Sequence, residues 1–220
     1  MPKIAIVDDR KDLRETLENK IKLYLRKLKL NWEVVGIAPF LEKDDYLNWI
    51  RENDIAVLIL DERLQEVQNN GLSVNYNGSH LIECLRKTLP DFPVYAITGY
   101  ETDSDLQDKF PLFDEILSRD SFFKRANEYI LRFTRSGQRF LDTYNSHLIK
   151  ISKISNLIAV GKATEEDIKE LNSIQEYLNI PFTSYYYLDR EAWLKDYLDN
   201  IDGLKKISNE IQDFISKNKQ

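Results

Sequence analysis

The sequence predicts an α/β fold, in which a doubly wound sheet of five parallel strands is followed by an all-α C-terminal region. Two observations predict the sheet: short apolar segments rich in β-branched residues, and amphipathic helical stretches between them. Strands that alternate with helices form a parallel sheet, because each helical crossover covers one of its faces. A third observation predicts the C-terminal region, since after about residue 136 only helical periodicity remains.

The first strand is the apolar run at residues 3–7, which Asp8 and Asp9 end. Apolar residues at steps of three and four then predict an amphipathic helix over the next stretch of chain. The same alternation continues to residue 118. It predicts strands at Glu33 to Ile37, Ile55 to Leu60, Val94 to Thr98 and Glu115 to Ser118, and helices at 43–52, 78–88, 103–110 and from about Asp120 onward.

The C-terminal region has a different pattern, with helical spacing throughout. We take Ser136 and Gly137 as the joint, and predict a first domain over residues 1–136 and a helical interaction domain over residues 137–220. A helix at 138–160 should stop at Gly161, and Thr164 has the residue type of a helix N-cap. Further helical stretches are predicted at 165–178, 190–198 and 204–215.

Composition excludes several classes of function. The formal net charge is −6, whereas binding to nucleic acid needs a cationic face, so we predict no DNA binding. The single cysteine, Cys84, cannot form an internal disulfide, which fits a reducing cytoplasm. No apolar run approaches the length of a membrane span. We therefore expect a cytoplasmic protein that does not contact a membrane.

Polar residues follow four of the predicted strands. Asp8 and Asp9 end the first strand, Asp61 the third and Thr98 the fourth, and Arg119 follows the fifth. Ligand sites of open parallel sheets lie beyond the carboxyl ends of the strands, where these side chains would meet. Clustered carboxylates repel one another, and Mg²⁺ would compensate them. A hydroxyl and a cation beside that metal suit phosphoryl oxygens, so the predicted chemistry is phosphoryl transfer onto a carboxylate.

Three short motifs carry a family resemblance. They are Ile-Ala-Ile-Val-Asp-Asp-Arg at 4–10, Val-Leu-Ile-Leu-Asp-Glu-Arg-Leu at 57–64, and Ala-Ile-Thr-Gly-Tyr at 96–100. In this order, at the ends of the first, third and fourth predicted strands, they resemble the receiver domain of bacterial two-component response regulators. The resemblance covers somewhat more than half of the chain. It implies the flavodoxin-like receiver fold, in agreement with the strand count from periodicity.

The resemblance also implies roles for individual residues. Asp61 would accept a phosphoryl group from a phosphohistidine on a histidine kinase or phosphotransfer protein. Asp9 and Asp61 would bind Mg²⁺ directly, Asp8 would assist, and the backbone carbonyl of Arg63 would complete the protein ligands. Thr98 would hydrogen-bond the phosphoryl group and couple phosphorylation to a shift of the nearby surface.

The sequence departs from the family pattern in two places. Arg119 stands where the family has a lysine, and because its charge is placed differently, phosphorylation could proceed with altered kinetics or be lost. The segment between Asp61 and Thr98 is also several residues longer than usual, with the extra residues in the polar stretch 65–77. This insertion could gate access to Asp61, form part of a partner surface, or be a tolerated surface loop.

We therefore predict a response-regulator-like switch rather than a metabolic enzyme. The helical region would pass the signal through contacts with a downstream protein or a second copy of the chain. One alternative is a pseudo-receiver scaffold independent of phosphorylation, which Arg119 and the insertion motivate. Another is a Mg²⁺-dependent phosphohydrolase with Asp61 as nucleophile, although neither Glu62 nor Arg63 is an obvious second acid for it.

Overall fold

The computed structural model describes residues 1–65 and 73–178. Within these residues the chain forms two compact units. The first covers Met1–Ile149, and the second begins at Lys150. None of the described helices is both long enough and apolar enough to cross a membrane.

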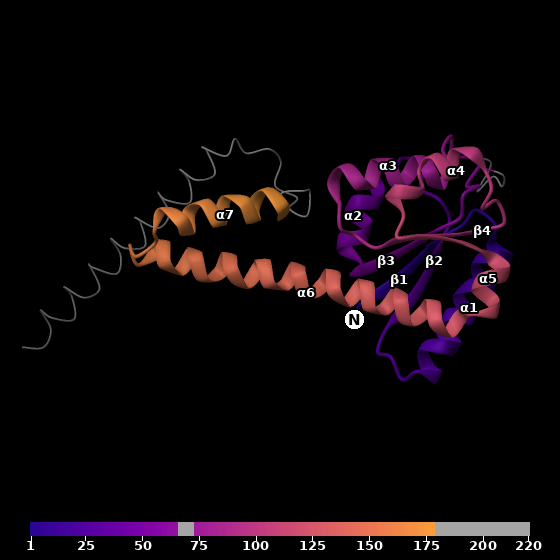
Figure 1. The fold of residues 1–220 in the computed structure, drawn as a ribbon, viewed down its shortest axis with the longest axis horizontal. Coiled ribbons are helices and arrows are strands. Elements are labelled where there is room, and N and C mark those ends of the chain that lie inside the picture. Colours follow the sequence, from indigo (N-terminus) through magenta and orange to yellow (C-terminus); the bar gives the residue numbers. More distant parts are fainter. Residues whose placement is uncertain (66–72, 179–220) are drawn as a thin grey trace, which may run out of the picture. The chain divides into compact units, whose positions relative to one another are not determined.

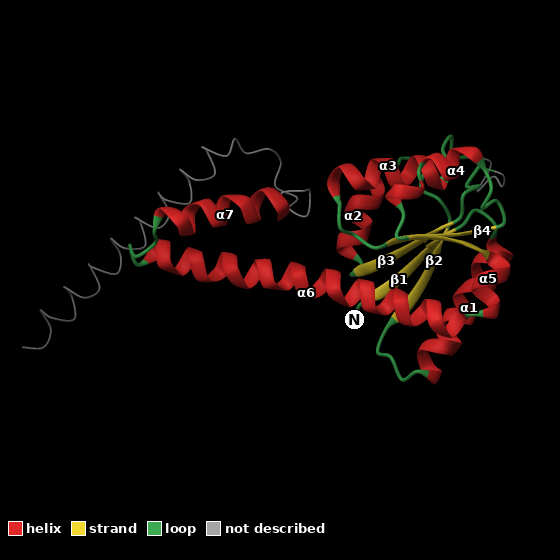
Figure 2. Ribbon diagram, viewed as in Figure 1, coloured by secondary structure: helices red, strands yellow, loops and turns green. Residues whose placement is uncertain are grey.

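A five-stranded parallel sheet forms the centre of the first unit (Figure 2). Its strand order is β2-β1-β3-β4-β5, so the doubly wound topology predicted from the sequence is confirmed. Polar residues lie at the carboxyl ends of β1, β3, β4 and β5. They are β1 (Lys3–Val7), β2 (Glu33–Ile37), β3 (Ile55–Leu60), β4 (Val94–Thr98) and β5 (Glu115–Ser118).

Helices cover both faces of the sheet (Figure 1). One face carries α1 (Lys11–Lys27), α5 (Arg119–Lys124) and the first half of α6 (Ala126–Ala159). The other carries α2 (Asp45–Glu52), α3 (Gly78–Thr88) and α4 (Ser104–Asp108). The structure gives α4 fewer residues than predicted, because the chain turns into a short 3₁₀ helix at Phe110–Leu112, which contains Pro111.

Strand residues alternate between two apolar clusters, one on each face. Ala5 and Val7 pack against α2 and α3, whereas Ile4 and Ile6 pack against α1 and α6. Every residue of β3 is buried, as expected for a central strand covered on both faces. The end of β3 is therefore held firmly by packing on both sides.

Residues 136 and 137, the predicted joint between domains, lie inside α6. A Cβ atom built on Gly137 would lie 2.6 Å from the ring of Trp32 and 2.7 Å from the side chain of Val57. The glycine thus lets α6 pack closely on the sheet, although glycine ordinarily weakens a helix interior. The compact units divide further along the chain, between Ile149 and Lys150.

The described part of the second unit is a helical hairpin made by the end of α6 and α7 (Glu165–Leu178). Lys150 pairs with Glu170 at 2.6 Å, and Ile154, Leu171 and Ile174 are buried. Gly161, with φ of +68°, follows the end of α6 as predicted. The helices predicted at 190–198 and 204–215 lie outside the described residues.

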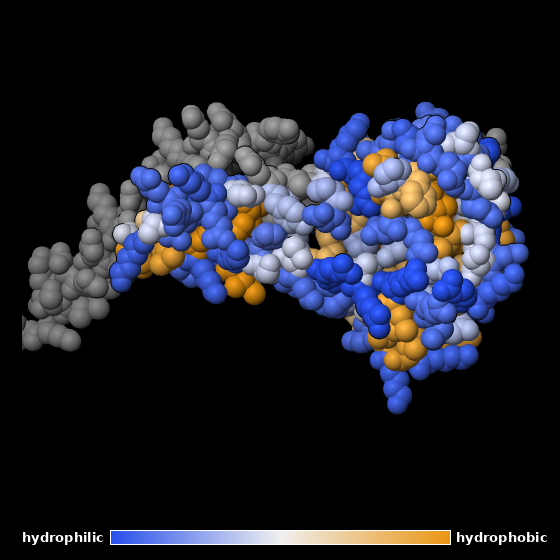
Figure 3. Space-filling view, viewed as in Figure 1, coloured by the Kyte–Doolittle hydropathy of each residue, from blue (hydrophilic) through white to orange (hydrophobic). Residues whose placement is uncertain are grey.

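Thr164 and Asp167 bond reciprocally at the start of α7, in agreement with the predicted N-cap. Polar side chains dominate the visible surface, with apolar patches along α7 and the end of α6 (Figure 3). Val160 and Ile168 are the large apolar side chains that the described part of this unit exposes.

The packing around Gly137 predicts that Gly137→Val lowers the free energy of unfolding. The new side chain would overlap Trp32 and Val57, and overpacking of this kind costs about 1–3 kcal/mol. Urea unfolding followed by circular dichroism measures the change. The control is Gly99→Val, because a Cβ at Gly99 would meet no atom within 4 Å. Equal losses in the two variants would contradict the close packing of α6.

Candidate functional site

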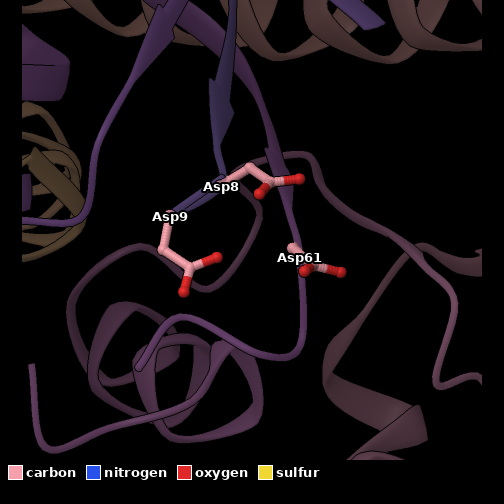
Figure 4. Close-up of side chains that lie close together, drawn as sticks. All are labelled: Asp8, Asp9 and Asp61. Atoms are coloured by element: carbon pink, nitrogen blue, oxygen red, sulfur yellow. The ribbon is translucent and has the colours of Figure 1, made fainter. Parts of the chain in front are cut away.

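Three aspartates meet at the carboxyl edge of the sheet. Asp8 and Asp9 follow β1, Asp61 follows β3, and these two strands are paired neighbours. Their exposed fractions are 3%, 1% and 2%, and a carboxylate oxygen from each lies within 4.8 Å of the others. Figure 4 shows the three side chains close together beyond the strand ends.

Arg119 brings a positive charge to this acidic cluster. It begins α5 directly after β5, where the Ser118 hydroxyl caps the helix by accepting a hydrogen bond from the backbone N–H of Ser121. One terminal nitrogen of its guanidinium lies 2.9 Å from Asp8 Oδ2 and 3.0 Å from Asp61 Oδ2. The structure therefore places Arg119 between two carboxylates of the cluster.

Burial and like charge disfavour the ionised form of Asp8. Burial is the largest cause and the nearby Asp61 adds to it, so that the pKa of Asp8 rises to about 6. The backbone N–H of Arg10 and the guanidinium of Arg119 act in the opposite direction. The effect of burial, together with the charge of Asp61, thus outweighs that of the guanidinium and the Arg10 N–H.

The donor set suits a divalent cation. Asp61 Oδ1 is buried and accepts no hydrogen bond from the described residues, so this oxygen is left for another ligand. Carboxylate oxygens are the ligands that Mg²⁺ prefers, and a cation would relieve the repulsion that raises the pKa of Asp8. The residues present therefore fit Mg²⁺.

Thr98 lies at the same edge of the sheet, at the end of β4, which pairs with β3. Its side chain is fully buried, and its hydroxyl oxygen accepts a hydrogen bond from the backbone N–H of Tyr100 at 3.1 Å. This bond fixes the first turn of the loop that follows β4.

The side chain of Arg63 points toward the loop after β4 rather than toward the acidic cluster. Its guanidinium pairs with Asp103 at 2.5 Å and lies over the ring of Tyr100, 4.9 Å from the ring centroid. Asp103 also caps α4, because its carboxylate accepts from the backbone N–H of Asp105. Arg63 thus links the loop that follows β3 to the loop that follows β4.

Glu62 follows Asp61, and its sequence position predicted no role for it beyond that of a poor candidate for a second acid. It is fully buried, and its carboxylate accepts hydrogen bonds from the backbone N–H of Ser79 at 2.9 Å and from the Ser79 hydroxyl at 2.7 Å. Burial raises its pKa to about 7, against the effect of the Ser79 bonds. The available signal was a second acidic residue, next to Asp61, just beyond a fully apolar strand.

The C-terminal end of the predicted insertion is anchored by buried side chains. The Tyr76 hydroxyl donates to the carbonyl oxygen of Phe40 and lies 3.3 Å from the hydroxyl of Tyr46. Val74 is also buried. Residues 66–72 lie outside the described part of the chain, and the expectation that the insertion gates access to Asp61 falls on them.

The raised pKa of Asp8 predicts that Asp8→Asn stabilises the protein at pH 7 when no Mg²⁺ is present. An acid whose pKa is higher in the folded than in the unfolded protein stabilises the fold fully below the unfolded pKa, here 3.8. That stabilisation is lost as the pH rises through the folded pKa of about 6. Removing the charge should raise the free energy of unfolding by roughly 1–2 kcal/mol. Urea unfolding in EDTA between pH 4.5 and 7.5 measures this, and the gain should shrink toward pH 4.5.

The matched control is Asp12→Asn, which removes an exposed aspartate from the first turn of α1. Added Mg²⁺ should stabilise the wild type more than the Asp8→Asn protein, because the cation binds the folded state. A loss of stability in Asp8→Asn at pH 7 without Mg²⁺ would contradict the repulsion argument.

Solved structures similar to this chain are receiver domains of response regulators. The response regulator TrrA from Thermotoga maritima, solved with Mg²⁺ and BeF, shares 19% identity over 60% of this chain and 99% of its own, with a TM-score of 0.45. A receiver domain protein from Clostridium thermocellum shares 16% identity over 63% of this chain and 96% of its own, with a TM-score of 0.45.

The HemR receiver domain from Leptospira biflexa shares 24% identity over 62% of this chain and 94% of its own, with a TM-score of 0.43. No protein-family profile and no curated protein matches the sequence. The three solved structures align with 60–63% of this chain.

Proposed function

We propose that the chain is a response-regulator-like switch that accepts a phosphoryl group on Asp61 in a Mg²⁺-dependent reaction. One observation carries the proposal: buried Asp61 lies within 4.8 Å of two further buried aspartates and is paired with Arg119. A carboxylate nucleophile, metal-binding oxygens and a cation are the groups that phosphoryl transfer onto aspartate needs.

Asp8, Asp9 and Asp61 would hold Mg²⁺, with the backbone carbonyl of Arg63 as a further ligand by family resemblance. When bound, Mg²⁺ would neutralise negative charge on the carboxylates and on the phosphoryl oxygens. The site would then admit an anionic phosphoryl group beside groups that are themselves acidic.

In the proposed step, a carboxylate oxygen of Asp61 forms a bond to phosphorus. The bond between phosphorus and an imidazole nitrogen of the partner's phosphohistidine breaks, and that nitrogen keeps the electron pair and binds a proton. Arg119 would move its charge from the carboxylate pair to the phosphoryl oxygens, and the hydroxyl of Thr98 would donate a hydrogen bond to one of them.

The same geometry gives less support to the two alternatives. A phosphohydrolase needs a second acid at the leaving group, but the carboxylate of Glu62 is held by Ser79, and Arg63 is paired with Asp103. A scaffold that is never phosphorylated gains nothing from buried like charges, which lower its stability.

The proposed partners are a histidine kinase or phosphotransfer protein, which would donate the phosphoryl group, and a downstream protein or second copy of the chain. The helical region 137–220 would make the second contact. Its described hairpin exposes Val160 and Ile168, and apolar side chains of this kind favour protein–protein contact. The proposed compartment is the cytoplasm, in keeping with a single cysteine.

The proposal predicts one added phosphoryl group on the wild-type protein after incubation with acetyl phosphate and Mg²⁺, and none on Asp61→Asn. The amide cannot act as the nucleophile. Intact mass measures the adduct. Asp54→Asn, which changes an exposed aspartate before β3, is the control that should still be modified. Equal modification of Asp61→Asn, or no adduct together with no Mg²⁺ binding by the wild type, would overturn the proposal.

The position of Arg119 predicts that Arg119→Ala slows phosphorylation about a hundredfold, because a cation beside the developing charge is lost. Arg119→Lys should recover most of the rate, since a lysine supplies the charge without the planar fork. The rate of adduct formation, followed by mass, tests both variants. Arg125→Ala, at an exposed pair with Glu128, should leave the rate unchanged. A wild-type rate in Arg119→Ala would show that Arg119 has only a structural role.

A further inference from the structure

Glu62 is a buried acid that the proposed chemistry does not use. It directly follows Asp61, yet its carboxylate is bonded to the first turn of α3 through the N–H and hydroxyl of Ser79. A negative charge at the start of this 11-residue helix is favoured by the helix dipole. The side chain therefore ties the residue beside the phosphoacceptor to a separate element.

The backbone makes a second connection at the same place. The N–H of Gly78 donates to the carbonyl oxygen of Glu62 at 3.0 Å. A Cβ atom on Gly78 would lie 2.4 Å from the carbonyl oxygen of Asp61, so only glycine allows this approach. The first turn of α3 thus holds Glu62 by two groups, its carbonyl oxygen through Gly78 and its carboxylate through Ser79.

The two ends joined in this way are far apart along the chain. Glu62 and Ser79 are 17 positions apart, and the lengthened segment 65–77 lies between them. Closing a longer loop costs more conformational entropy, so a long insertion leaves the ends of the loop less constrained by the chain itself. The bonds between Glu62 and Ser79 hold the two ends of this segment together.

We propose that Glu62 is a positioning residue that, through Ser79, sets the orientation of the Asp61 carboxylate and the backbone carbonyl of Arg63 for Mg²⁺ binding. The proposal rests on the proposed function, because it assumes that Asp61 is a metal ligand and phosphoacceptor. Groups that orient metal ligands typically change metal affinity 10–100-fold, roughly, when they are removed.

The test measures Mg²⁺ affinity by titration calorimetry on the full chain, with binding of beryllofluoride followed by ¹⁹F NMR. Glu62→Ala should weaken Mg²⁺ binding at least about tenfold. Glu62→Gln should bind within about threefold of the wild type, since its amide can accept from the Ser79 N–H and donate to the Ser79 hydroxyl. Ser79→Ala keeps the backbone bond and should give a smaller loss than Glu62→Ala.

A matched control separates positioning from general destabilisation. Leu25→Ala removes a buried side chain of α1 in the apolar cluster on the other face of the sheet from α3. It should lower stability but leave Mg²⁺ affinity unchanged. Equal weakening in Leu25→Ala, equal weakening in Glu62→Gln, or wild-type affinity in Glu62→Ala would each overturn the positioning role.

Failure of the proposed function has a different signature. Wild-type protein that binds neither Mg²⁺ nor beryllofluoride would overturn the phosphoacceptor assignment, and the positioning role with it. If Glu62→Ala does not fold, the comparison of Ser79→Ala with Leu25→Ala decides. Unchanged affinity in a folded Ser79→Ala protein would then overturn the positioning role alone.

Discussion

The repulsion among three buried carboxylates is the constraint on which the rest of this site depends. When Asp8, Asp9 and Asp61 are ionised they carry three negative charges within 4.8 Å, and Arg119 supplies one positive charge. The remaining charge, −3 + 1 = −2, equals in magnitude that of one divalent cation. Burial, and after it the charge of Asp61, raise the pKa of Asp8 to about 6, so its proton is held more tightly than usual.

Such repulsion is tolerated only where the backbone cannot relax. Asp61 ends β3, which is buried on both faces, and β1 beside it carries the other two aspartates. Beyond the strand ends, side chains connect successive loops: Glu62 bonds to the start of α3, and Arg63 pairs with Asp103 at the start of α4. The like charges are therefore held together by sheet packing and by these polar links.

The strands were predictable with their bounds, because each centres on a short apolar run between stretches of helical periodicity. The position of Ser136 and Gly137 inside a helix was not predictable. A glycine at a helical position is typical of a flexible joint unless the residue packed against it is known. Here the partner is Trp32, more than a hundred residues earlier in the chain. The three aspartates lie at the ends of predicted strands, so their proximity could be predicted from the order of the strands. The bond between Glu62 and Ser79 joins residues on either side of the insertion, and no strand or helix pattern predicts it.

Arg119 divides its positive charge between two of the carboxylates. Its guanidinium nitrogen is shared by Asp8 and Asp61, so part of its charge compensates a residue other than the proposed acceptor. A phosphoryl group on Asp61 would add oxygens with more negative charge than the carboxylate they replace, and a planar guanidinium can bind two of them at once. If Arg119 moved from Asp8 to the phosphoryl group, Asp8 would lose its positively charged partner. The repulsion between Asp8 and Asp9 would then increase unless Mg²⁺ is bound. In the proposed reaction, charge balance would therefore make Mg²⁺ binding and capture of the phosphoryl group by Arg119 depend on each other.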